Sequence, residues 1–213
     1  MHWLRYRATS PPTRTPLGKP FMNLRLVETT IPGCYELQAR QLSDDRGTFV
    51  KTYHREWFQS LGLRTDWVEQ YYSVSKPGVV RGLHFQLPPH DHAKLVYCIS
   101  GRVLDVALDL RKGSPTYGEH IRRELSAEKS NMLYLPAGLA HGFSTYGEPA
   151  TLVYNVTSVY HPASDTGIRW DSAGIKWPHK KPKVSDRDQG FAGFSDFCSP
   201  FVFNAFETTG NKP

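Results

Sequence analysis

One short segment of the chain brings a basic side chain and a candidate general base close together. In Gly78–Gln86, Arg81 and His84 lie three residues apart, where a turn runs into a predicted strand. A neutral imidazole can remove a proton near pH 7, which makes His84 a candidate catalytic base. A single histidine on a strand is more often structural, so this interpretation depends on other reactive groups that converge with it.

Short strands are the elements that would have to position such groups. From about residue 24 onward, apolar or alternating runs are divided by turn residues, a pattern typical of an antiparallel sandwich or barrel. One helix is predicted at Arg55–Leu61, and neither a GxGxxG nor a Walker motif is present. Turn signals occur at 32–33, 44–47, 77–78, 112–115 and 136–138. The predicted strands are Cys34–Leu37, Thr48–Tyr53, Trp67–Val74, Lys94–Ser100, Val103–Leu110, Met132–Leu135 and Thr151–Val156.

Positive charge is concentrated near the N-terminus. Of the formal net charge of +6, four charges come from Arg5, Arg7, Arg14 and Lys19, where no acid is present, which leaves +2 for the rest of the chain. The proline- and threonine-rich composition predicts a disordered basic tail at 1–21, followed by a single folded domain at 22–213. No nucleic-acid-binding motif accompanies the charge, so we expect no nucleic-acid partner.

Cysteine usage and hydropathy favour a cytoplasmic protein. Cys34, Cys98 and Cys198 are few, widely spaced and odd in number, as expected of reduced thiols. No run approaches the roughly 20 apolar residues that span a bilayer. The N-terminal residues also lack the apolar core of a secretory signal. We therefore expect no membrane partner.

A series of motifs in order along the chain resembles the dTDP-4-dehydrorhamnose 3,5-epimerase family. The resemblance implies an all-β, cupin-type jelly-roll barrel of antiparallel strands with a few short helices, which forms a homodimer. It implies an isomerase of deoxysugar biosynthesis that epimerises a nucleoside-diphosphate 4-keto-6-deoxyhexose at C3, C5 or both, without a metal or another cofactor. The motifs lie between about Asp44 and Asp188 and include Arg81–Gln86, Lys94–Val96, Asp105–Gly118, Leu125–Glu128, Leu135–Phe143, Tyr154, Gly167–Trp170 and Gly174–Pro178.

Four side chains carry the proton transfers that the resemblance implies. His84 would be the base, Asp188 the carboxylate paired with it, and Tyr154 the acid on the opposite face of the sugar. Lys94 would stabilise the enolate oxygen at C4. A proton beside a ketone is acidic because the carbanion delocalises onto the carbonyl oxygen, where a buried cation stabilises the developing charge. Inversion needs proton donors and acceptors on both faces, and a carboxylate on the far nitrogen fixes the histidine tautomer.

Two of these assignments have close competitors. Asp186 lies two residues before Asp188 in a polar stretch, where either acid would ordinarily be a surface charge. Tyr160 is a second phenol near Tyr154, and a tyrosine in a strand is ordinarily a core residue.

Lys94 heads an apolar run, so a buried charge there would need a function.

Substrate binding is assigned by the same resemblance. Arg81 would hold the diphosphate, and Arg46 and Phe49 lie in a segment that would reach the neighbouring subunit's site in the dimer. The family usually has Glu at position 51, Gln at 69 and Asn at 71, and these departures favour a nucleotide other than thymidine, such as cytidine or guanosine. The substrate-binding residues are predicted to be Arg46, Phe49, Lys51, Glu69, Tyr71, Arg81, His141 and Arg169.

Other functions remain open on the residues alone. His90, His92 and His141 resemble the metal ligands of other cupins, which would make the protein a metal-dependent enzyme. Lys94 stands near the position where a carboxylate ligand is expected and would repel a cation. The remaining alternatives are an epimerase that acts at C3 alone on a non-thymidine nucleotide sugar, a barrel that binds sugar nucleotides without catalysis, and a nucleic-acid-binding role for the tail.

Overall fold

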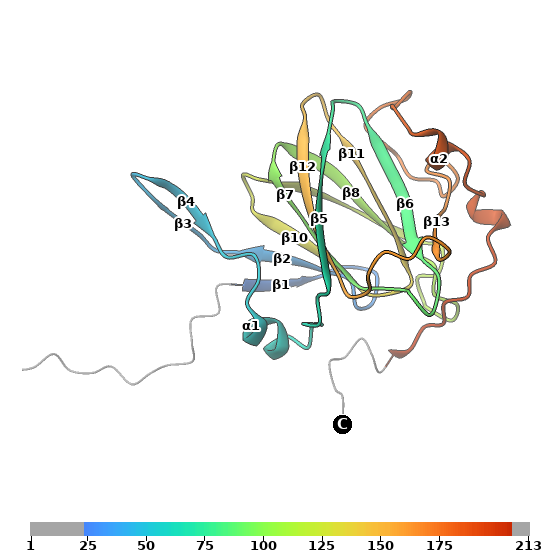
Figure 1. Ribbon diagram of the computed structural model, residues 1–213, viewed down its shortest axis with the longest axis horizontal. Coiled ribbons are helices and arrows are strands. Elements are labelled where there is room, and N and C mark those ends of the chain that lie inside the picture. Colours follow the sequence, from blue (N-terminus) through green and yellow to red (C-terminus); the bar gives the residue numbers. More distant parts are fainter. Residues whose placement is uncertain (1–23, 206–213) are drawn as a thin grey trace, which may run out of the picture.

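Antiparallel strands form almost all of the computed structural model, which describes residues 24–205 (Figure 1). The predicted tail at 1–21 lies outside the described residues, so its disorder stays a prediction. Two sheets face each other, and a separate two-stranded hairpin extends from them. The all-β fold class and the antiparallel jelly-roll barrel are therefore confirmed. No helix within residues 24–205 is long and apolar enough to cross a membrane.

The larger sheet has six strands, which follow the spatial order β1-β2-β10-β7-β12-β5. Among residues 24–205, its edge strand β5 pairs with β12 alone, with Tyr154 opposite Tyr71 in the register. Its strands are β1 (Leu24–Glu28), β2 (Tyr35–Ala39), β5 (Glu69–Ser75), β7 (Lys94–Ser100), β10 (Asn131–Leu135) and β12 (Ala150–Val156).

The smaller sheet has five strands in the order β13-β6-β11-β8-β9. Its strands are β6 (Val80–Gln86), β8 (Arg102–Asp109), β9 (His120–Ser126), β11 (Leu139–Thr145) and β13 (Asp165–Gly167). Short helices lie outside the sheets, at α1 (Arg55–Ser60), α2 (Asp186–Gln189) and the 3-10 turn η1 (Phe194–Asp196).

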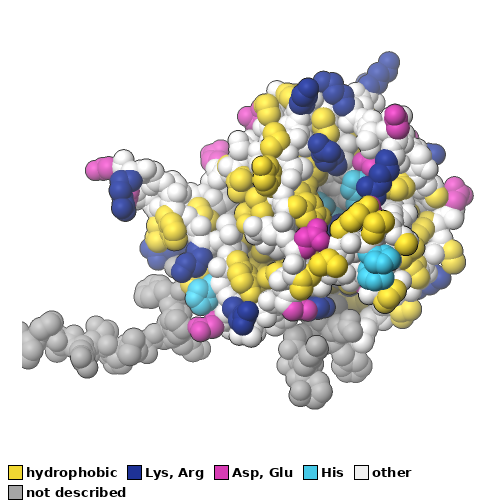
Figure 2. Space-filling view, in the orientation of Figure 1, with side chains coloured by type: hydrophobic (Ala, Val, Ile, Leu, Met, Phe, Trp, Pro, Cys, Tyr) yellow, Lys and Arg dark blue, Asp and Glu magenta, His cyan; other side chains and the backbone are white. Residues whose placement is uncertain are grey.

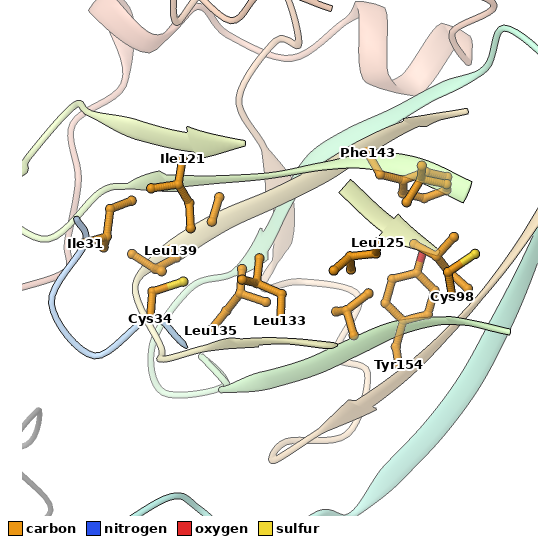
Figure 3. Close-up of a cluster of buried hydrophobic side chains, with 14 of the residues drawn as sticks. Ile31, Cys34, Cys98, Ile121, Leu125, Leu133, Leu135, Leu139, Phe143 and Tyr154 are labelled. Carbon is orange, nitrogen blue, oxygen red and sulfur yellow. The ribbon is translucent and has the colours of Figure 1, made fainter. Parts of the chain in front are cut away.

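Apolar side chains fill the space between the sheets because successive residues of a strand point to opposite faces. The inner cluster includes Val96, Leu133 and Phe143 (Figure 3). Two further clusters cover the outer faces. One joins α1 to the six-stranded sheet through Phe58, and the other packs the C-terminal segment onto the five-stranded sheet through Phe201. This packing covers part of each outer face, while the outer face of the edge strand β5 stays exposed.

The predicted strands agree with the structure where the apolar signal is strong. Lys94–Ser100 has the predicted bounds, and the helix predicted at Arg55–Leu61 ends one residue earlier. The strand predicted at Thr48–Tyr53 is shorter, because β4 (Gly47–Val50) ends where the chain leaves its hairpin partner β3 (Gln41–Asp44). Five strands escaped prediction because they are short, polar or glycine-containing: β1, β3, β9, β11 and β13.

The β3–β4 hairpin projects away from the barrel (Figure 1). Its turn falls at Asp45–Arg46, where the sequence predicts a turn. Every residue of β3 is exposed, and the Phe49 side chain of β4 is 60% exposed. Among the described residues, the hairpin therefore presents a large aromatic side chain to solvent.

Candidate active site

A cavity of about 380 Å³ opens between the two sheets at one end of the barrel. Figure 2 shows this hollow, with histidine side chains inside it and basic side chains at its rim. Most of the residues around it alternate along their strands, because successive side chains of a strand point to opposite faces. The walls include Glu69, Tyr71 and Ser73 of β5, His84 and Gln86 of β6, Lys94 of β7, His141 of β11 and Tyr154 of β12.

His84 is paired with Asp188, which lies 104 residues further along the chain. The His84 Nε2 lies 2.8 Å from the Asp188 Oδ1. Because an ionised carboxylate only accepts hydrogen bonds, Nε2 must carry the proton, which leaves Nδ1 as the basic nitrogen. Burial lowers the pKa of His84 below its ordinary value, and the contact with Asp188 acts in the opposite direction. His84 is therefore a neutral base at neutral pH.

The start of α2 fixes the Asp188 carboxylate. Ser185 is the N-cap residue, and its hydroxyl accepts a hydrogen bond from the Asp188 backbone N–H. The Gly82 N–H donates to Asp188 Oδ2 at 3.0 Å. Burial acts to raise the pKa of Asp188, but its hydrogen bonds with His84, Gly82 and Ser185 lower the pKa below the usual value. Asp186 is exposed, so Asp188 is the acid that the fold brings to the histidine.

Gly82 allows this close approach between strands. Its φ is +131°, and a Cβ on Gly82 would lie 2.5 Å from the Gly142 Cα of β11. Any larger residue would push β6 away from β11 and displace the N–H that holds Asp188.

Lys94 is a buried cation beside the histidine. Its side chain is within the barrel, and Nζ donates a hydrogen bond to the His84 carbonyl at 3.1 Å. Burial lowers the pKa of Lys94 to about 8, although Asp165 and Asp105 favour the charged form. The lysine therefore remains mostly protonated at pH 7 and presents its charge within the cavity.

Tyr154 reaches the cavity from the sheet opposite His84. Its hydroxyl lies 3.1 Å from the Ser73 Oγ, and its ring stacks on the Tyr71 ring with centroids 4.8 Å apart. Burial raises the pKa of Tyr154, while the Ser73 contact partly opposes this change. The phenol is therefore held in its protonated form. Tyr160, the competing phenol, also lines the cavity but is 59% exposed.

A second histidine–carboxylate pair involves His141, which lines the same cavity. The His141 Nε2 lies 2.9 Å from the Asp105 Oδ2, and both side chains are buried. Burial raises the pKa of Asp105, and His141 acts in the opposite direction. The His141 ring meets the Tyr154 ring edge-on at a centroid distance of 6.0 Å.

The residues predicted to bind substrate divide into two groups. Arg81, Glu69 and Tyr71 line the cavity with His141. The remaining predicted residues, Arg46, Phe49, Lys51 and Arg169, do not line the cavity of the single chain. Arg169 is 46% exposed and paired with Asp171, and the other three lie on or beside the projecting hairpin.

Sequence reasoning missed two charged residues of the cavity. Asp165 and Arg187 line it and form an ion pair, with the Arg187 Nη2 2.6 Å from the Asp165 Oδ2. Arg187 precedes Asp188 on α2, so its adjacency to a candidate catalytic acid was the available signal. The position of Asp165 carried no comparable signal, because β13 is only three residues long.

The three histidines of the metal alternative do not form a ligand group. His90 stacks on His161 with centroids 3.7 Å apart, and its Nδ1 contacts Ser164. His92 lines the cavity with Nδ1 3.2 Å from the Gln86 amide nitrogen. His141 is paired with Asp105. Within residues 24–205, no cluster of three or more histidine, cysteine or acidic side chains is placed to hold a metal ion.

The arrangement suits proton transfer to and from carbon. A neutral base on one sheet and a protonated phenol on the other face the same cavity, and a buried ammonium lies beside the base. Two acid–base groups on opposite walls can act on opposite faces of one bound carbon acid. A cation in a site of low dielectric stabilises the oxyanion of the intermediate.

A sequence profile of the dTDP-4-dehydrorhamnose 3,5-epimerase family matches residues 28–196. The chain belongs to this family. It is 37% identical to the dTDP-4-dehydrorhamnose 3,5-epimerase of Shigella flexneri, over 81% of this chain and 97% of that protein. The resemblance inferred from the motifs is therefore confirmed, and the protein is an isomerase of the epimerase class.

Solved structures of epimerases share the barrel. The Legionella pneumophila enzyme, crystallised with dTDP-4-keto-L-rhamnose, is 30% identical and has a TM-score of 0.81, over 85% of this chain and all of that one. The 3'-monoepimerase ChmJ of Streptomyces bikiniensis, in complex with dTDP-quinovose, is 33% identical with a TM-score of 0.74, over 78% of this chain and 86% of that one. The family thus contains enzymes that differ in the number of carbons they invert.

The lowered pKa values of His84 and Lys94 predict a bell-shaped pH dependence for kcat/KM of the epimerase. Activity should rise with pH through a pKa below the ordinary histidine value of 6.5, because His84 must be neutral to accept a proton. It should fall through about pH 8 as Lys94 loses its charge. Lys94→Arg should remove the basic limb up to about pH 10, because a guanidinium stays protonated there. A wild-type profile that is flat from pH 6.5 to pH 9 would contradict the assignment of Lys94.

Proposed function

We propose that this epimerase inverts C3, C5 or both of a nucleoside-diphosphate 4-keto-6-deoxyhexose by removing and returning protons through an enolate. The observation that carries the proposal is the placement of His84 and Tyr154 on opposite sheets around one cavity that also contains Lys94. A nucleotide-sugar substrate agrees with the ligands named for related structures. A cytoplasmic location, expected from the unpaired cysteines, is part of the same proposal.

In the first step, the His84 Nδ1 takes the proton from the carbon beside the ketone. The electron pair of the broken C–H bond moves onto the carbonyl oxygen, which becomes an enolate oxyanion. Lys94 stabilises this oxyanion, because its ammonium group is buried and already charged before the reaction. Asp188 stabilises the imidazolium that forms, because its carboxylate accepts the hydrogen bond from Nε2.

In the second step, Tyr154 donates its phenolic proton to the opposite face of the same carbon. The enolate electrons form the new C–H bond, the ketone is restored, and the configuration is inverted. The tyrosinate then regains a proton and the imidazolium releases one, so both groups return to their starting states. The raised pKa of Tyr154 favours this return, because a buried phenolate binds a proton strongly.

The negative charge of the diphosphate needs cations at the mouth of the cavity. Arg81 and Arg187 both line it, and each is partly exposed. Guanidinium groups bind phosphate oxygens in a bidentate manner, so we assign the diphosphate to these two residues. Glu69, Tyr71 and His141 would contact the sugar or the nucleotide from the cavity walls.

Proton NMR in D2O tests the proton-transfer roles. His84→Ala should abolish deuterium incorporation at C3 and C5, because it removes the proposed base that is paired with Asp188. Tyr154→Phe should still permit incorporation but lower inversion by about 100- to 10,000-fold, the usual contribution of a general acid. A folded wild-type protein that incorporates no deuterium from any 4-keto-6-deoxyhexose nucleotide would contradict the proposed function. A fully active Tyr154→Phe variant would show that another group is the acid, with Tyr160 the next candidate.

A second proposal concerns the nucleotide. Lys51, Glu69 and Tyr71 stand where the family resemblance has Glu, Gln and Asn, so one acceptor has become a cation and one neutral amide has become an anion. Glu69 and Tyr71 line the cavity, so these two changes would lie beside a substrate bound there, whereas Lys51 does not line the cavity. Exchanging donors and acceptors changes which base edge a site can pair with. We therefore propose a cytidine or guanosine sugar rather than a thymidine one.

Calorimetry with dTDP, CDP and GDP tests this preference. CDP or GDP should bind at least about tenfold more tightly than dTDP, the discrimination expected from one reversed hydrogen bond. Lys51→Glu with Glu69→Gln should shift the preference towards dTDP. Much tighter binding of dTDP by the wild-type protein would rule out the proposal on the nucleotide and leave the proton chemistry untouched.

The homodimer is a third proposal, supported by the outer face of the six-stranded sheet. Tyr72 and Val74 of β5 point away from the cavity and are 70% and 63% exposed, and Ile99 of β7 is 55% exposed. Apolar side chains gathered on one sheet face are typical of an interface. A second copy on this face would also give the projecting β3–β4 hairpin a neighbouring subunit to contact. Arg46, Phe49 and Lys51 would then complete the partner's site.

Mixed dimers test whether the hairpin acts on the partner's site. His84→Ala lacks the base, and Arg46→Ala with Phe49→Ala lacks the hairpin contacts, so each homodimer should have low activity. In a mixed dimer, the subunit with intact His84 receives the intact hairpin of the other subunit. Refolding an equal mixture should therefore restore about a quarter of the wild-type activity, because half of the dimers are mixed and each has one complete site. Activity no higher than the mean of the two homodimers would show that the hairpin serves its own chain.

A further inference from the structure

Tyr154 is held at two points by the same neighbouring strand. Tyr71 lies directly opposite Tyr154 in the β5–β12 register, and the two rings stack at 4.8 Å with an interplanar angle of 17°. Ser73, the next inward residue of β5, contacts the Tyr154 hydroxyl at 3.1 Å. One strand therefore supports both the face of the ring and its reactive oxygen.

The hydroxyl contact alone cannot fix the phenol. A single hydrogen bond restrains the position of one atom, but the ring can still turn about its side-chain bonds while the oxygen stays near Ser73. A parallel ring at van der Waals distance removes this freedom, because rotation would drive the two rings into each other. His141 meets the Tyr154 ring only at its edge, at 6.0 Å, and so limits its tilt less closely.

Tyr71 also separates Tyr154 from the solvent in the mouth of the cavity. Tyr71 is 41% exposed, whereas Tyr154 is 6% exposed. The Tyr71 ring is therefore the layer between water and the face of the reactive phenol. Burial raises the pKa of Tyr71 to about 12, and the negative charges of Glu69 and Asp165 act in the same direction. Tyr71 thus remains a neutral phenol over the working pH range.

We propose that Tyr71 is a positioning residue that holds Tyr154 at the angle required to protonate the enolate on the face opposite His84. The inference rests on the proposed function, because it assumes that Tyr154 is the acid. Tyr71 does not transfer the proton itself. It determines how often the enolate receives its proton from Tyr154 rather than from His84 or water, and therefore how often an exchange event becomes an inversion.

The ratio of inversion to deuterium exchange measures this role. Proton NMR in D2O reports both, since exchange without inversion removes the C3 or C5 proton signal of the starting sugar and inversion produces the new epimer. Tyr71→Leu should lower the ratio by about three- to tenfold, the rate equivalent of one aromatic pair, while exchange continues. Tyr71→Phe keeps the ring and should restore the ratio. Tyr71→Asn is the second variant for the case in which Tyr71→Leu does not fold.

Tyr117→Leu provides a matched control. Tyr117 is 40% exposed and has an aromatic neighbour in Phe194 at 5.9 Å, but it does not line the cavity. The same substitution there should leave both exchange and inversion unchanged. An unchanged ratio in Tyr71→Leu, or an equal loss of exchange and inversion, would overturn the proposed role of Tyr71 while the proposed function stood. A wild-type protein without exchange would overturn the proposed function, and this inference with it.

Discussion

Four polar groups inside this barrel each have a partner that offsets the cost of leaving water. His84 has Asp188, His141 has Asp105, Lys94 has a backbone carbonyl and Tyr154 has a serine hydroxyl. The cavity lies between the two sheets, in the same space that apolar side chains fill elsewhere (Figure 3). The reactive groups therefore keep fixed positions, because moving one of them would leave a buried partner unsatisfied.

The same loss of solvent shifts the pKa values of the groups in the cavity. Burial lowers the pKa values of His84 and Lys94 and raises that of Tyr154. These changes leave a neutral base, a cation that is still charged at pH 7, and a phenol that keeps its proton. Burial thus favours the neutral form of all three groups, and at Lys94 the carboxylates of Asp165 and Asp105 act against it and favour the cation.

Much of the fold and part of the site could be predicted from the sequence. Lys94 begins a strand whose apolar run gave its bounds, and His84 lies in a motif that local spacing makes visible. The contact of Asp188 with His84 spans 104 residues, so only the family resemblance pointed to that acid. Strand β11 was missed because glycine and histidine interrupt its apolar pattern, yet it carries His141. Arg187 was missed although it adjoins Asp188 in the sequence, because that adjacency does not show which side of α2 faces the cavity.

The edge strand β5 has two different faces, and in the described part of the chain its hydrogen-bonded ladder joins it to β12 alone. Tyr71 and Ser73 point inward, whereas Tyr72 and Val74 point to the outer surface. A shift of register by one residue would exchange the two faces completely. Insertions or deletions in the turn at Lys76–Val79 are therefore tolerated only if they leave this register intact. The length of that turn therefore affects how Tyr71 and Ser73 hold Tyr154, and through Tyr154 the configuration of the product that we propose, although none of the turn's residues lines the cavity.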